Sequence, residues 1–198
     1  MTGLQRLFTD FGQSPWLDNL TRRSLHDGTL TRWVRDGIRG VTANPTIFAR
    51  AITGSDDYDT QFHALIDAGY TVDDAYWELV LNDIRDASVV LRPTFDESSA
   101  TDGYVSIEVA PEIARDTHAT IAAARELHQR IALPNVYVKI PATAEGVPAI
   151  EAMTSSRRST SESTRLTKKD ATPCTVAGSP PAATNVSRPA MYASITSA

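Results

Sequence analysis

Glu108 and Lys139 are the two residues of this sequence whose types and positions best suit an active site. Each stands near the C-terminal end of a short apolar segment typical of a buried strand, residues 103–109 and 136–140. Because side chains alternate along a strand, both charges lie opposite the aliphatic residues of their own segments. Each charge alone is more often a solvated surface residue. Together, at the end of parallel strands where ligands bind, they predict an active site.

The segments around these residues alternate between strand and helix. From Pro111 an apolar stripe at helical spacing runs until Leu133-Pro134 ends it, giving a strand–helix–strand unit of the length that parallel sheets require. Earlier segments repeat the alternation, so we predict an α/β fold with a parallel sheet. These segments are a strand at 38–43, a helix from Asn44-Pro45, a helix closed by Gly69, and one from Thr71, with Arg92-Pro93 at its end or in the loop beyond it.

The charged strand faces favour a barrel over an open sheet. A doubly wound sheet is covered by helices on both faces, so both faces of its strands are expected to be apolar. A barrel interior tolerates polar groups near its mouth, where the active site lies. The aliphatic faces of 103–109 and 136–140 suit covering helices, and the faces with Glu108 and Lys139 suit a barrel mouth.

The composition changes near Met153. Residues 154–198 contain 17 Ser or Thr among 45 residues and only six large apolar side chains. Six cations against two anions give this tail a charge of +4, which leaves −9 for residues 1–153. Such a composition buries too little apolar surface to offset the entropy of ordering, so we expect residues 154–198 to be a disordered or out-of-frame tail.

Several function classes are disfavoured. The single Cys174 excludes an internal disulfide and a cysteine-based zinc site, and the four histidines lack metal-ligand spacing. No glycine-rich nucleotide loop is present, and the net charge of −5 gives no support for binding to nucleic acid or an anionic membrane. No apolar run is long enough to span a bilayer and no signal segment is visible, so we expect a cytoplasmic protein.

Four segments resemble transaldolases in type, order and spacing. They are Trp16–Leu20 (WLDNL), Asp36–Phe48 (DGIRGVTANPTIF), Val105–Val109 (VSIEV) and Val138–Thr143 (VKIPAT). The similarity covers about residues 12–153 and is closest to the longer bacterial form. It implies a (β/α)₈ barrel that moves a dihydroxyacetone unit from sedoheptulose 7-phosphate to glyceraldehyde 3-phosphate in the non-oxidative pentose phosphate pathway. It also implies a Schiff base, sugar-phosphate substrates, and neither a metal nor an organic cofactor.

The resemblance implies a role for each matched residue. Lys139 corresponds to the nucleophile that attacks the ketose carbonyl, and Glu108 to an acid/base acting through a water molecule. Asp18 corresponds to the group that takes the hydroxyl proton when the carbon–carbon bond breaks. Asn44 corresponds to a ligand of the bound three-carbon unit, and Thr42 to a lining residue of the same mouth. Asp18 and Asn44 also suit a strand-end cap and a helix N-cap, and both uses are compatible with catalysis.

The sequence departs from the family pattern after Met153. The fifth strand with its Asn-x-Thr pair and the later phosphate ligands are not recognisable, so we expect an incomplete barrel of about four βα units, with little or no turnover by this chain. The alternatives are a catalytically inactive fragment, another class I sugar-phosphate aldolase, and a binding protein with a basic tail. An assay with sedoheptulose 7-phosphate separates the first two from transaldolase, and salt-dependent binding to nucleic acid or anionic lipid tests the last.

Overall fold

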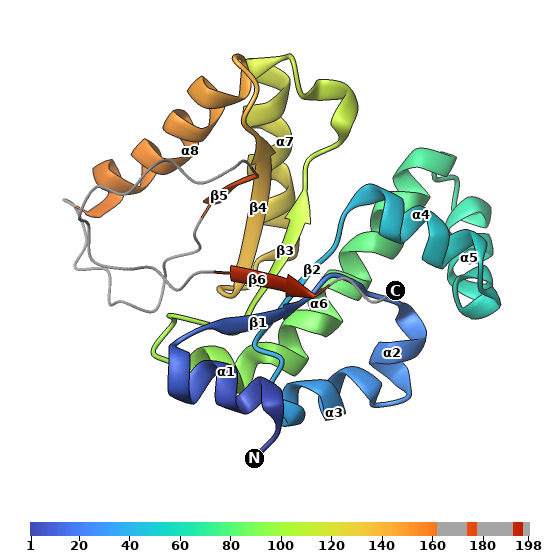
Figure 1. Cartoon of the computed structure of the whole chain (residues 1–198). Helices are drawn as coiled ribbons and strands as arrows, with labels where there is room; N and C mark the ends of the chain where they lie inside the picture. Colours follow the sequence, from blue (N-terminus) through green and yellow to red (C-terminus); the bar gives the residue numbers. More distant parts are fainter. Residues whose placement is uncertain (162–173, 178–191, 196–198) are drawn as a thin grey trace.

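A computed structural model describes residues 1–161, 174–177 and 192–195 of the chain (Figure 1). In chain order its elements are α1 (Gly3–Phe11), β1 (Ser14–Leu17), α2 (Arg22–His26), α3 (Thr29–Asp36), β2 (Gly40–Thr42), α4 (Pro45–Thr53), the 3₁₀ turn η1 (Asp56–Tyr58), α5 (Asp59–Asp67), α6 (Val72–Glu97), β3 (Tyr104–Glu108), the 3₁₀ turn η2 (Pro111–Ile113), α7 (Thr117–Ile131), β4 (Val136–Pro141), α8 (Gly146–Ser161), β5 (Cys174–Ala177) and β6 (Tyr192–Ile195).

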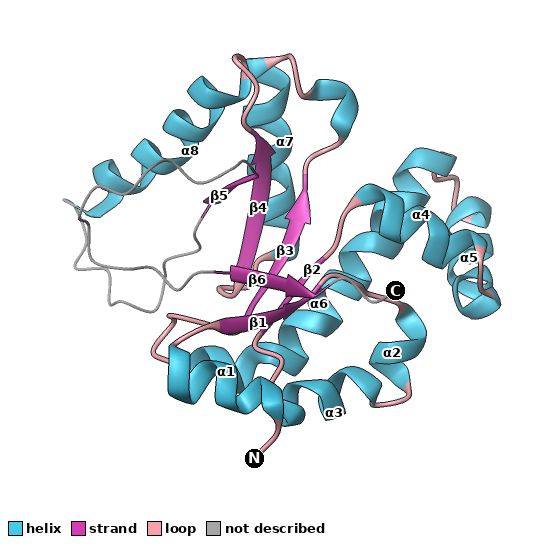
Figure 2. Cartoon of the chain, in the orientation of Figure 1, coloured by secondary structure: helices cyan, strands magenta, loops and turns pink. Residues whose placement is uncertain are grey.

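The strands form one parallel sheet in the order β5-β4-β3-β2-β1-β6 (Figure 2). Strands β1 to β4 are neighbours in chain order, and helices make every connection between them. The predicted α/β fold with a parallel sheet is therefore confirmed. Within the described residues the order runs from β5 at one edge to β6 at the other, so the strands do not close into a ring there. All C-terminal strand ends of β1 to β4 point to one edge, which gathers the predicted site residues.

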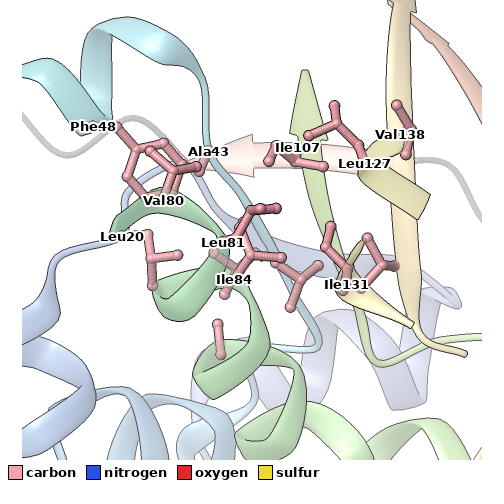
Figure 3. Packing of buried hydrophobic residues seen from close by; sticks show 14 of the residues in the cluster. Leu20, Ala43, Phe48, Val80, Leu81, Ile84, Ile107, Leu127, Ile131 and Val138 are labelled. Carbon is pink, nitrogen blue, oxygen red and sulfur yellow. The ribbon is translucent and has the colours of Figure 1, made fainter. Parts of the chain in front are cut away.

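One face of the sheet is aliphatic and lies under helices. Val105 and Ile107 of β3 and Val138 of β4 are buried in a core with residues of α6 and α7 (Figure 3). Leu81 and Ile84 of α6 are fully buried in the same core. Each such side chain contributes about 1.5–3 kcal/mol when it is removed from water. This core holds β3 and β4 side by side, and it fixes the register that pairs Glu108 with Lys139.

The opposite face carries an aromatic layer. Trp16 of β1 and Tyr137 of β4 are stacked with their centroids 6.2 Å apart, and Tyr137 stacks on Tyr104 of β3 at 3.9 Å. Phe95 of α6 meets Tyr104 edge-on. Gly40 of β2 lies beside Trp16 in the register, and a Cβ there would overlap the indole ring. The missing side chain of Gly40 thus gives the indole its space.

Two local expectations are corrected. The helix from Thr71 does not end at Arg92-Pro93, because α6 continues through Pro93 to Glu97. Proline removes one helical hydrogen bond, but Phe95 in the turn beyond it is buried in the aromatic layer, and this packing offsets the loss. The helix expected from Pro111 begins later. Pro111 starts only a 3₁₀ turn, and α7 begins at Thr117, where the Asp116 side chain accepts the Ala119 N–H.

The expected tail is described only in part. Helix α8 continues past Met153 to Ser161, and two four-residue segments, β5 and β6, pair with β4 and β1 at the sheet edges. For these segments the structure has helix and strands where we expected disorder. Residues 162–173, 178–191 and 196–198 lie outside the described residues, so the state of the tail there stays a prediction. Among the helices that are described, none has both the length and the apolar character needed to cross a bilayer.

Candidate active site

Lys139 and Glu108 are register partners on β4 and β3 and form an ion pair between Nζ and Oε1. Glu108 is the last residue of β3 and Lys139 stands two residues before the end of β4, both on the face opposite the aliphatic core. Their side chains are 18% and 31% exposed, so the pair is shielded yet open to a ligand. The structure therefore places an amine beside a carboxylate that can accept its proton, as acid/base chemistry requires.

Thr42 completes the surroundings of the amine. Lys139 Nζ donates a hydrogen bond to Thr42 Oγ1 at 2.9 Å, and Ser106 Oγ donates to the same oxygen at 2.9 Å. Thr42 and Ser106 are themselves register partners on β2 and β3. Ser106 is buried and was not among the predicted site residues, although strand alternation puts it on the same face as Glu108. The amine thus contacts one carboxylate and one hydroxyl group, and a second hydroxyl group holds the first.

The polar groups lie one layer above the aromatic side chains. Tyr104 and Ser106 follow each other on the same face of β3, as do Tyr137 and Lys139 on β4. The aromatic layer therefore lies next to the polar groups on the same face of the sheet, and the Lys139 side chain is 18% exposed.

Asp18, Asn44 and Glu108 line one pocket of about 900 Å³. Asp18 directly follows β1, and its carboxylate has no hydrogen-bond or ion-pair partner among the described residues. Asn44 Oδ1 accepts the Ile47 N–H at 3.0 Å and so caps α4, with Pro45 at the first helical position. Because the cap uses only Oδ1, the Nδ2 hydrogens of Asn44 remain for a ligand.

The predicted residues form two connected groups. Lys139 contacts both Glu108 and Thr42, whereas Asp18 and Asn44 share the pocket with Glu108 and make no hydrogen bond or ion pair with Lys139. Glu108 belongs to both groups and joins the amine to the pocket. Within residues 1–161, 174–177 and 192–195, no three His, Cys, Asp or Glu side chains cluster as a metal site would require.

The remaining lining of the pocket includes three arginines and the carboxylate of Asp57. Arg22, Arg23 and Arg50 line it, from α2 and α4. Arg22 is buried and ion-paired with Asp83 at 2.9 Å. Arg23 pairs with Asp57 at 3.1 Å across the rim, where the arginine side chain is 66% exposed. Since Asp18, Asp57 and Glu108 line the same pocket, its lining carries charges of both signs.

Comparison with known proteins identifies the family of this chain. A family model described as transaldolase/fructose-6-phosphate aldolase matches residues 15–185. The chain belongs to this family. Its parallel sheet agrees with the (β/α)₈ barrel of the transaldolase family. The match continues past Met153, where we expected the resemblance to end, into residues that are described only in part.

Curated transaldolases are similar to most of the described chain. A transaldolase 2 of Nostoc punctiforme is 48% identical over 142 residues, which is 71% of this chain and 37% of that protein. A transaldolase 2 of Streptomyces coelicolor is 42% identical over 151 residues, 76% of this chain and 41% of that protein. A transaldolase of Thermobifida fusca is 45% identical over 150 residues. The chain spans about two fifths of the length of the relatives it matches.

Proposed function

We propose that this chain carries the Schiff-base site of a transaldolase, which transfers a dihydroxyacetone unit from sedoheptulose 7-phosphate to glyceraldehyde 3-phosphate in the non-oxidative pentose phosphate pathway. The observation that carries the proposal is the contact of Lys139 Nζ with Glu108 and Thr42, beside the pocket lined by Asp18 and Asn44. The names of the similar proteins support the same activity.

Lys139 forms the covalent intermediate. After its ammonium proton passes to Glu108, the neutral Nζ attacks the ketose carbonyl carbon, and the carbonyl electrons move to oxygen. Glu108, acting through a water molecule, returns the proton to the carbinolamine hydroxyl, which leaves as water and generates the imine. Thr42 Oγ1 accepts one Nζ hydrogen in the resting site and so orients the amine toward the pocket.

Asp18 performs the next proton transfer. Its carboxylate takes the proton of the hydroxyl group beyond the breaking bond, a carbonyl forms there, and the bond electrons move to the imine nitrogen. A four-carbon aldose phosphate leaves, and the three-carbon unit stays on Lys139 as an enamine. Asn44 Nδ2 donates to an oxygen of this unit. The enamine then attacks the acceptor aldehyde, and hydrolysis frees the amine and the new ketose phosphate.

Fructose-6-phosphate aldolase activity is the second candidate, because the family description names it as well. The two reactions share the imine and differ in its fate: an aldolase releases dihydroxyacetone to water, whereas a transaldolase holds the unit until an acceptor arrives. The transaldolase names of the relatives favour the latter. Since the substrates belong to central carbohydrate metabolism, we also propose that the protein acts in the cytoplasm.

Borohydride trapping tests the proposal. The chain has three lysines, Lys139, Lys168 and Lys169, so the labelled position is easily assigned by peptide mass spectrometry. Incubation with sedoheptulose 7-phosphate and reduction should place the label on Lys139, and a three-carbon adduct shows that cleavage has occurred. Lys168→Arg with Lys169→Arg is the matched control and should keep the label. Labelling that persists in Lys139→Ala would remove the assignment.

A further inference from the structure

We propose that Arg22, Tyr58 and Asp83 form a clamp that positions Asp18 opposite Asn44, which makes them positioning residues of the site; this rests on the proposed function. Asp83 of α6 accepts from Arg22 Nε at 2.9 Å through Oδ1 and from the Tyr58 hydroxyl at 2.8 Å through Oδ2. The Tyr58 oxygen in turn accepts the backbone N–H of Arg22 at 3.0 Å. The three residues therefore close a ring of hydrogen bonds.

The three side chains of the clamp are shielded from water, which strengthens the hydrogen bonds between them. Tyr58 and Asp83 are each 1% exposed and Arg22 is 6% exposed. The guanidinium carbon lies 4.2 Å from the centre of the Tyr58 ring, so the cation is covered by an aromatic face as well. Burial raises the pKa of Asp83 against the opposing effect of Arg22. Removal of one partner leaves the others buried and unsatisfied, so the three groups act as a unit.

The clamp joins the two walls of the pocket from behind. Arg22 is the first residue of α2 and follows the loop that begins at Asp18. Tyr58 ends η1, which α4 and its cap Asn44 precede. Arg22 and Tyr58 both line the pocket, whereas Asp83 lies behind it on α6. Helix α2 contacts both η1 and α6. The two carboxylate oxygens of Asp83, which bind Arg22 and Tyr58, thus set the distance between the pocket wall that contains Asp18 and the wall that contains Asn44.

A second link between α2 and η1 is weaker. Arg23 and Asp57 also connect α2 with η1, but the arginine side chain is 66% exposed, and such pairs contribute about 0–1 kcal/mol. Because this ion pair is exposed to water, it does not hold α2 and η1 at a fixed distance. Since carbon–carbon cleavage requires Asp18 at hydrogen-bond distance from one substrate hydroxyl, a small shift of its loop slows this step. Imine formation at Lys139 uses other elements, β3, β4 and β2, and is unaffected.

Tyr58→Phe is the decisive variant, because it removes one oxygen atom and leaves the ring in place. Tyr70→Phe is the matched control, since Tyr70 is 44% exposed and its hydroxyl makes no hydrogen bond with the described residues. With sedoheptulose 7-phosphate and borohydride, Tyr58→Phe should label Lys139 within about twofold of the unsubstituted rate. Its three-carbon adduct should form about tenfold more slowly, so that the intact seven-carbon adduct accumulates.

A second measurement needs no substrate. Amide hydrogen exchange over residues 18–23 and 55–58 should be about tenfold faster in Tyr58→Phe than in Tyr70→Phe, while β3 and β4 keep their protection. Unchanged exchange in both segments overturns the clamp. If exchange rises but the adduct ratio stays that of the unsubstituted chain, the trio is structural and does not position Asp18. Absence of any label on the unsubstituted chain rejects the proposed function instead, and the exchange result still decides whether the clamp exists.

Discussion

Glu108 and Lys139 are paired residues of adjacent parallel strands, and their side chains meet at the strand ends in an ion pair. The pairing results from two forces on opposite faces of the sheet. Val105, Ile107 and Val138 fix the register through the aliphatic core beneath α6 and α7, and the aromatic layer closes the other face below the charged pair. The amine and its proton acceptor are thereby held by rigid strands rather than by loops.

Glu108→Ala and Asp18→Ala should slow different steps. Loss of the Glu108 carboxylate removes the group that shuttles protons in imine formation and hydrolysis, and should slow label uptake at Lys139 by about 10²–10⁴-fold. Loss of Asp18 should leave label uptake nearly unchanged but block cleavage, so that the seven-carbon adduct accumulates. Peptide mass spectrometry of borohydride-trapped samples over time distinguishes the two. Equal loss of both steps in both variants contradicts separate roles.

Thr42→Val should slow imine formation, whereas Thr42→Ser should retain most of it. Valine keeps the shape but removes the oxygen that accepts from Lys139 Nζ and from Ser106, and the amine then loses its alignment. Loss of a hydrogen bond to a charged group costs about 1.5–3 kcal/mol, which corresponds to roughly 10–150-fold in rate. The rate of borohydride-trapped label on Lys139 measures this. A valine variant as fast as the serine variant shows that Thr42 does not orient the amine.

The sequence pattern was sufficient to predict which face of each strand carries Glu108 and Lys139. Alternation placed Glu108 and Lys139 opposite the aliphatic residues, because a parallel strand buries both faces and can carry charge only near its end. Asn44-Pro45 likewise predicted a helix start, since an amide cap and a proline at the first helical position are local signals. The five predicted site residues all lie within two residues of the C-terminal ends of β1 to β4.

Long-range contacts were not predictable in this way. Arg22 and Asp83 are 61 residues apart, and nothing local in either segment marks a buried ion pair. Pro93 is a strong local signal for a helix end, yet burial of Phe95 beyond it outweighs one lost hydrogen bond. Ser106 has an ordinary residue type, and only the register with Thr42 shows that it supports Lys139. Tertiary packing decided each of these cases.

Gly40→Ala should destabilise the chain and disturb the packing of the aromatic layer next to the site. A Cβ at Gly40 would overlap the Trp16 indole, so the ring must shift away from Tyr137. Overpacking of this kind costs about 1–3 kcal/mol, measurable as a lower urea midpoint. Gly3→Ala is the control, because no atom lies within 4 Å of its added Cβ. Equal midpoints for the two variants contradict the tight contact between Gly40 and Trp16.

Tyr58 should make the chain less stable in alkaline solution. Burial, with the nearby Asp83 charge, raises the pKa of Tyr58 above the ordinary value near 10. The folded chain therefore holds this proton more tightly than the unfolded chain, and the free energy of unfolding is highest below pH 10. As pH rises past 10 the unfolded state loses the proton first, so stability falls until the folded pKa is passed. Urea unfolding between pH 8 and 11 measures this slope.

The substitution Tyr58→Phe should flatten the alkaline slope without abolishing it. Burial also raises the pKa of Tyr76, which donates to the Pro45 carbonyl at 3.4 Å and keeps its own contribution. Tyr70→Phe serves as the control and should keep the full slope, since Tyr70 is largely exposed. At pH 8 the Tyr58 variant should already be less stable, because the buried Asp83 carboxylate loses a hydrogen bond there. A Tyr58→Phe slope equal to that of Tyr70→Phe would show that the Tyr58 proton is not tied to the folded state.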